Sequence, residues 1–377
     1  MGAAVIRSEG DAPATVAAAP GSPRYPLLDG LRAVAAGLVL VYHGVLLADN
    51  GNGRLVRDLG QQGVAIFFVL SGFLLYGPFV RARVHGHGLP SLRDYARRRA
   101  VRIVPAYWLA LTYALLVAGA TSVTAGHIPI YYLLLQDYVN GARYHGLPVT
   151  WSLSIEATFY ILLPLLAYIA IRLARWGSER WQMLPEALII AGFVIVPAAL
   201  HFLHPGAPPT ILSYTDWFAG GMLLALVAVH LREPRSLPVS VSVAVWVIGV
   251  VVFVGETHTQ PFGGYFGHVL MAVTAVAIVT PAVFPAQRGV VTAALELPGL
   301  AWLGTVSYGI YLWHMPIMST ILKVHHLGAV PLILIAAALT VVIAAASYRF
   351  LEAPLIRRFR TRRAWNAGRP RLTKTPR

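Results

Sequence analysis

The sequence contains no cysteine and few charged residues. Without cysteine, the 377-residue chain cannot form a disulfide, a thiolate metal site or a cysteine nucleophile. Charged residues make up 12% of the chain, whereas a soluble domain has about 25%. Together with 57% hydrophobic residues and a mean hydropathy of +0.65, this scarcity excludes a soluble globule and indicates a membrane protein.

Apolar windows of about 20 residues, each long enough to cross a bilayer, recur along the chain. We predict an all-α, polytopic transmembrane helix bundle of about ten spans. The predicted spans are 27–47, 62–80, 104–122, 150–172, 186–203, 212–231, 239–255, 267–285, 300–322 and 331–351. The predicted domains are a disordered N-terminal tail (1–24), the transmembrane domain (25–352) and a basic cytoplasmic tail (353–377).

Basic residues predict the orientation of these spans. Most Lys and Arg fall in alternate loops, whereas only Arg54, Arg57, Arg143 and Lys323 fall in the loops of the opposite side. Because short cytoplasmic loops are enriched in Lys and Arg, we expect both termini in the cytoplasm and the protein in the inner (plasma) membrane. The same bias explains the net charge of +15 without a nucleic-acid partner.

The first predicted span carries ionisable residues on one face. Arg32 and His43 are eleven residues apart, so they project from the same side of a helix, about 16 Å from each other. Asp29 lies near the same stripe. An arginine inside a span costs about 2.5–3.5 kcal/mol, and such residues are usually functional. Taken alone, Arg32 is equally well explained by snorkelling to the head groups, and His43 by a hydrogen bond to a neighbouring helix.

Other polar residues fall at the same predicted depth as His43. They lie in the outer halves of four further spans and are Glu156, His201, Asp216 and His314. Five helices contributing polar groups at one depth indicate an internal site, although ordinary hydrogen bonding within a bundle explains any single member.

Arginines are concentrated at the start of the third span. Arg98, Arg99 and Arg102 cluster within about one helical turn, and guanidinium groups suit bidentate capture of phosphate. The alternative interpretation is topology signalling or binding of anionic lipid.

Five segments together resemble the acyltransferase 3 family of integral membrane O-acyltransferases, over about residues 25–352. They are Leu-Asp-Gly-Leu-Arg at 28–32 with His43 following, and the segments 63–74, 98–105, 151–156 and 307–314. The resemblance implies that acyl-CoA enters from the cytoplasm, that Arg32 contacts the donor, and that Arg99 and Arg102 bind CoA phosphates. It also implies that His43 is essential for transfer to a hydroxyl.

A mechanism follows from these residue types. An imidazole with a pKa near 6.5 suits removal of a proton from an attacking alcohol, so we predict His43 as the general base. We expect Glu156 to accept the other ring N–H of His43, as the carboxylate does in a catalytic triad. With the CoA head held by Arg98, Arg99 and Arg102, the pantetheine arm would pass Arg32 toward His43. An acyl-histidine intermediate would instead imply two half-reactions.

The predicted function is transfer of an acyl group from cytoplasmic acyl-CoA, such as acetyl-CoA, to a sugar-containing acceptor. The acceptor is either a glycosylated small molecule such as a macrolide or a cell-envelope glycan or glycolipid. Membrane lipids are the other expected partners, and no metal is required. Further predicted substrate-binding residues are Asp29, Trp151, Ser152, Tyr160, Asp216 and His314. The alternative is a proton-coupled transporter or flippase.

Overall fold

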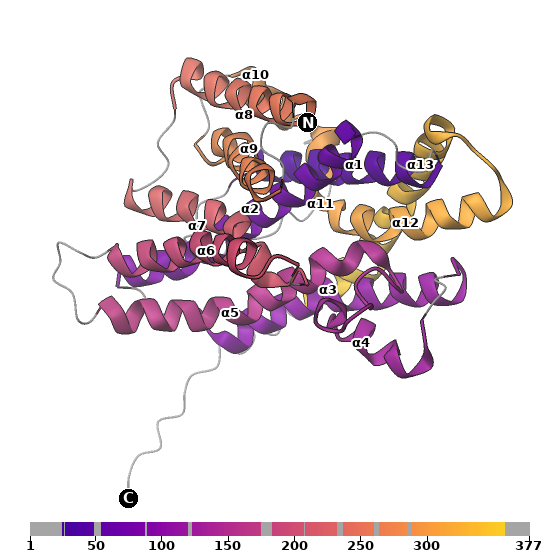
Figure 1. The fold of residues 1–377 in the computed structure, drawn as a ribbon, viewed down its shortest axis with the longest axis horizontal. Coiled ribbons are helices and arrows are strands. Elements are labelled where there is room, and N and C mark those ends of the chain that lie inside the picture. The colour runs from indigo at the N-terminus through magenta and orange to yellow at the C-terminus, as the bar shows by residue number, and fades with distance from the viewer. Residues whose placement is uncertain are drawn as a thin grey trace, which may run out of the picture.

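The computed structural model of the chain is helical, with no β-strand among the residues it describes (Figure 1). Those residues are 25, 27–48, 54–86, 89–119, 123–174, 183–206, 208–231, 237–259, 264–284 and 289–358. The long helices are α1 (Leu27–Ala48), α2 (Arg54–Val84), α3 (Leu92–Leu116), α5 (Trp151–Ala174), α6 (Leu184–Leu203), α7 (Thr215–His230), α8 (Val239–Thr259), α9 (Tyr265–Val283), α12 (Ser307–Val324) and α13 (Ala329–Ser347). This confirms the all-α prediction.

Shorter elements connect the long helices. They are η1 (Ala125–His127), α4 (Ile128–Tyr132), η2 (Gln136–Tyr138), η3 (Pro148–Thr150), η5 (Ile211–Ser213), α10 (Val290–Leu295), α11 (Pro298–Thr305) and the π-helical turn η6 (Tyr348–Glu352). Helical structure continues beyond η6 to residue 358, into the segment predicted as a tail. The predicted N-terminal tail and residues 359–377 lie outside the described residues.

Six helical segments in the described part of the chain are long and apolar enough to cross a membrane. They are Leu27–Ala48, Leu55–Val84, Pro148–Ala174, Leu184–Leu203, Tyr265–Val283 and Ala329–Arg358. Two further segments, Thr215–His230 of α7 and Val239–Gly255 of α8, are apolar but shorter. Two of the predicted spans, in α3 and α12, fall short of this criterion because arginine, histidine, lysine and tyrosine side chains lower their hydropathy. The structure therefore shows a multi-pass membrane protein, with candidate site residues both on the apolar helices α1 and α5 and on the more polar helices α3 and α12.

Helices α1 and α2 form the centre of the bundle. Helix α1 packs against α2, α11, α12 and α13, and α2 packs against α7 and α9, as Figure 1 shows. These contacts bring the first span together with the last two, which are almost 300 residues away in the sequence. The His43 end of the stripe predicted on α1 therefore faces α12.

Glycine allows the closest of these helix crossings. A Cβ atom at Gly221 of α7 would collide with the backbone of Val69 in α2, and one at Gly304 of α11 would collide with the backbone of Asp29 in α1. Since lipid provides no hydrophobic drive between helices, close backbone approach through small residues is a main source of packing energy in membranes. The crossing at Gly304 also fixes the N-terminal end of α1, where Asp29 and Arg32 lie.

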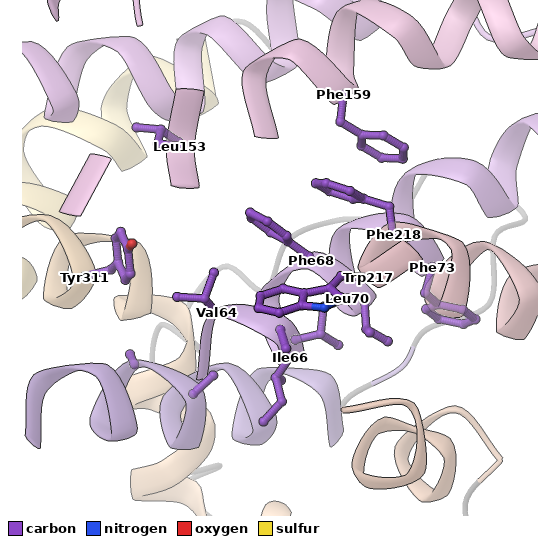
Figure 2. Close-up of a cluster of buried hydrophobic side chains, with 14 of the residues drawn as sticks. Val64, Ile66, Phe68, Leu70, Phe73, Leu153, Phe159, Trp217, Phe218 and Tyr311 are labelled. Carbon is purple, nitrogen blue, oxygen red and sulfur yellow. The ribbon is translucent and has the colours of Figure 1, made fainter. Parts of the chain in front are cut away.

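Aromatic rings fill the contact between α2, α5 and α7 (Figure 2). Phe218 stacks between Phe68 and Phe159, with ring centroids 4.5 Å and 4.2 Å away, respectively. Stacked and buried rings of this kind contribute beyond the area they bury. The stack holds α5, which carries Glu156 and Tyr160, against α2.

Candidate active site

The two histidines predicted at one depth are in contact. Nε2 of His314 on α12 lies 3.2 Å from Nδ1 of His43 on α1, and their ring centroids are 5.0 Å apart. His314 is fully buried, whereas His43 is partly exposed. The helix contact between α1 and α12 thus joins two polar groups that the sequence separates by 271 residues.

Backbone carbonyls set the tautomers of this pair. Nδ1 of His43 lies 2.9 Å from the carbonyl oxygen of Val39, so Nδ1 carries the proton and donates. Nδ1 of His314 lies 3.2 Å from the carbonyl oxygen of Ile310, so it also donates, and Nε2 of His314 is left as an acceptor facing His43. In the described part of the chain, Nε2 of His43 makes no hydrogen bond. Its lone pair is therefore available to a ligand.

Glu156 does not take the place we expected beside His43. Its Oε1 accepts a hydrogen bond from the hydroxyl of Ser71 on α2, and it hydrogen-bonds Tyr160 one turn further along α5. It also interacts electrostatically with Arg99. The expected contact with His43 is therefore wrong in this structure, because α5 packs against α2 and directs the carboxylate toward the arginines of α3.

Three of the predicted arginines gather at the other end of the α1 stripe. Nη1 of Arg32 forms an ion pair of 2.8 Å with Asp29, and Arg32 interacts electrostatically with Arg99 and Arg102. We refer to Arg32, Arg99 and Arg102 as the arginine cluster. The close spacing of three like charges is costly at this depth and indicates a site for an anion.

The arginine cluster contains a hydrogen-bond donor that has no partner within the described residues. The guanidinium of Arg99 lies over the ring of Tyr160, 5.6 Å from its centroid. Nε of Arg99 is buried and has no hydrogen-bond partner within the described residues. Because buried donors are almost always paired, this orphaned group is a fit for the phosphate of an absent ligand. Arg98, the third arginine predicted there, is exposed on α3, whereas the three members of the arginine cluster are half-buried.

The remaining predicted residues contact residues that were not predicted, rather than gathering around His43. Ser152 lies 2.6 Å from the hydroxyl of Tyr311, and Asp216 pairs with His268 at 3.0 Å. The Trp151 ring packs on Tyr214, with centroids 5.2 Å apart, and the exposed His201 ring stacks on Tyr265. Tyr311 lies one turn before His314, so Ser152 is linked to the histidine pair through α12. Asp216 belongs to a separate pair between α7 and α9.

Sequence reasoning missed several partners. Ser71, Tyr311 and His268 each bond a predicted residue, and Glu352 lies near Arg102. Ser71 and Tyr311 stand inside the segments that carry the family resemblance, which is the signal that could have found them. His268 has no such signal, since its role comes only from the approach of α9 to α7.

An ion pair lies in the connection between α3 and α5. Nη1 of Arg143 lies 3.1 Å from Asp137, and the Arg143 guanidinium covers the Trp151 ring at 4.6 Å from its centroid. Burial raises the pKa of Asp137 to about 6, although the charge of Arg143 favours its ionised form. Arg143 also donates to the carbonyl of Pro209, and so ties this loop to the one before α7.

Fold and site define a multi-pass helical membrane protein with a histidine pair and an arginine cluster at the two ends of one helix face. The chain belongs to the acyltransferase 3 family, whose acyltransferase domain it matches over residues 25–349. This confirms the resemblance seen in the sequence.

Similar proteins include O-acetyltransferase OatA of Staphylococcus aureus, 28% identical over 89% of this chain and 58% of that protein. Peptidoglycan O-acetyltransferase OatA of Listeria monocytogenes is 28% identical over 88% of this chain and 55% of its own length. Nodulation protein 10 of Rhizobium leguminosarum is 28% identical over 87% of this chain and 92% of that protein. The chain thus spans little more than half the length of the two OatA proteins. No solved structure is significantly similar to it.

Proposed function

We propose that this protein is an O-acyltransferase that moves an acetyl or other short acyl group from acyl-CoA to a sugar hydroxyl. The observation that carries the proposal is the pairing of His43 with His314 on the helix face that also presents Arg32 to Arg99 and Arg102. An oriented base at one end and an anion site at the other suit a long donor with phosphates at its head and a thioester at its tip.

The proposed orientation places the arginine cluster at the cytoplasmic side. Each of the ten predicted apolar windows overlaps a helix in the described part of the chain, which supports this arrangement; in it, most basic residues would fall in cytoplasmic loops. Acyl-CoA would then bind from the cytoplasm, and His43 would lie in the outer half of the inner (plasma) membrane. Both termini would be cytoplasmic.

In the proposed reaction, Nε2 of His43 takes the proton of the acceptor hydroxyl as its oxygen attacks the thioester carbonyl. Nδ1–H of His43 remains bonded to the Val39 carbonyl and faces Nε2 of His314, which stabilises the imidazolium. Collapse of the tetrahedral intermediate breaks the C–S bond, and the imidazolium returns the proton to the departing thiolate. The products are the O-acyl ester and free CoA.

The proposed role of Glu156 changes with its position. Through Ser71, Tyr160 and Arg99 it belongs to the donor end, where it orients a guanidinium instead of the base. Tyr160, predicted to bind substrate, would act at the same end. Trp151 and Ser152 stay proposed residues of the acceptor side, since Ser152 bonds Tyr311 next to His314.

The acceptor we propose is a cell-envelope carbohydrate. The similarity to O-acetyltransferases of Staphylococcus and Listeria, the second of which is named for peptidoglycan, supports a glycan hydroxyl. Glycosylated small molecules such as macrolides are the alternative acceptors, and the experiment below includes them.

The test is acyl transfer by the purified protein in lipid nanodiscs, with radiolabelled acetyl-CoA and three acceptor classes: peptidoglycan fragments, simple sugars and macrolides. We expect CoA release that depends on a sugar acceptor and is lost in His43→Ala. If the protein neither binds nor consumes acetyl-CoA with any of these acceptors, the proposal is overturned and a transporter is favoured.

A further inference from the structure

Glu352 is a buried carboxylate to which the proposed reaction assigns no role. It is 5% exposed and ends the π-helical turn η6, directly after α13. Its nearest hydrogen-bond partner is the Ser347 hydroxyl, 3.4 Å from Oε1. Single π-helical turns occur frequently at functional sites, and an ionisable residue at membrane depth calls for a partner.

The charged partner of Glu352 is Arg102. The two side chains interact electrostatically, and η6 packs against α3, the helix that carries Arg102. Tyr308 of α12 interacts with the same carboxylate, and its hydroxyl donates to the carbonyl of Ile103, 2.8 Å away and next to Arg102. Three helices therefore meet at this arginine, and Glu352 supplies the negative charge.

With this pair, each member of the arginine cluster has one carboxylate. Arg32 has Asp29 at 2.8 Å, Arg99 interacts with Glu156, and Arg102 interacts with Glu352. Three guanidinium groups this close repel one another unless counter-charges hold them, because the surroundings screen poorly. Removing one carboxylate would let its arginine turn away from the other two.

We propose that Glu352 is a positioning residue for donor binding: it holds Arg102 toward Arg32 and Arg99, so that the three guanidinium groups face the CoA phosphates together. The inference rests on the proposed function, since it takes the arginine cluster as the donor site. It adds a residue from the last helix to a site otherwise built from α1, α3 and α5.

The experiment measures CoA binding by calorimetry, with KM and kcat for acetyl-CoA, on the full-length protein in nanodiscs. Glu352→Gln keeps the shape of the side chain and removes its charge, and Glu352→Asp keeps the charge. Glu296→Gln, at the exposed end of α10, is the matched control for loss of one carboxylate. We expect Glu352→Gln to weaken CoA binding and raise KM by about 10-fold, with kcat changed less than about 3-fold and partial recovery in Glu352→Asp.

A double-mutant cycle separates positioning from general stability. In an Arg102→Gln background, Glu352→Gln should cause little further loss of CoA affinity, because its effect passes through Arg102. Equal losses in both backgrounds, or unchanged CoA affinity in the single variant, would overturn the inference. If Glu352→Gln lowers the unfolding temperature, the same double-mutant cycle is measured with Glu352→Asp in place of Glu352→Gln. Absence of CoA binding by the unaltered protein would refute the proposed donor itself, a distinguishable result.

Discussion

Nε2 of His314 lies 3.2 Å from Nδ1 of His43 and can accept the proton that this nitrogen carries. A histidine therefore occupies the place that a carboxylate has in a serine-protease triad. A neutral imidazole fixes the tautomer of its partner as a carboxylate does, but it stabilises the charged form less. The pair therefore orients the base without adding a negative charge to an apolar part of the bundle.

The histidine pair predicts a graded loss of activity. His43→Ala should lower kcat by about 10²–10⁴-fold, the usual contribution of a general base. His314→Ala should lower it by about 10-fold or more, because the base loses its orientation but keeps its lone pair. His326→Ala, an exposed histidine after α12, should leave kcat unchanged. The measurement is initial rates at saturating acetyl-CoA; full activity of His314→Ala would refute the orienting role.

The arginines of α3 should differ in their importance for the donor. Arg99→Lys should raise KM for acetyl-CoA by about 10-fold, since lysine cannot supply the fork of donors that phosphate prefers. Arg98→Lys, its exposed neighbour, should raise KM much less. Steady-state kinetics over a range of acetyl-CoA concentrations compares them, and equal effects would show that the arginines act through surface charge alone.

Substitution of Glu156 tests whether this residue acts at the donor end, near Arg99, or beside His43. Glu156→Gln removes the charge near Arg99 but keeps a side chain able to accept from Ser71. We expect KM for acetyl-CoA to rise by a few-fold to about 10-fold, and the pH dependence of kcat to stay that of the unaltered protein. A changed kcat profile with unchanged KM would instead restore the original expectation that Glu156 assists His43.

Asp137 should make stability depend on pH. Its pKa is raised from 3.8 to about 6 in the folded protein, so between these values the folded state binds more protons than the unfolded state. Stability from this group therefore increases as the pH falls from 7 toward 4 and is lost as the pH rises through 6. Relative to Asp137→Asn, the unaltered protein should gain on the order of 1 kcal/mol between pH 7 and pH 5. Parallel unfolding temperatures of the two proteins across this range would contradict the prediction.

The crossing of α2 and α7 should tolerate no added methyl group. Gly221→Ala would place Cβ against the backbone of Val69, and overpacking of this kind costs about 1–3 kcal/mol. Gly192→Ala, on α6 with open space around its Cα, should be neutral or slightly stabilising. Thermal unfolding in the same detergent compares the two, and equal unfolding temperatures would show that the helices can separate freely.

Some features of the fold followed from the sequence because they are local. The apolar windows required membrane helices, and the turn of an α-helix placed Arg32 and His43 on one side of α1. The distance between two helices in space is not local. His314 and His43 are paired because α12 packs on α1, and the sequence predicted only their common depth.

The sequence by itself determined that this is a helical membrane protein of the acyltransferase 3 family, with ionisable residues placed inside its apolar helices. Only the tertiary structure decided the partners: His314 for His43, Ser71 for Glu156 and Glu352 for Arg102. The physical reason is that helical periodicity fixes the direction of a side chain on its own helix. The rotation and closeness of neighbouring helices are instead set by distant contacts, such as that of Gly221 with Val69.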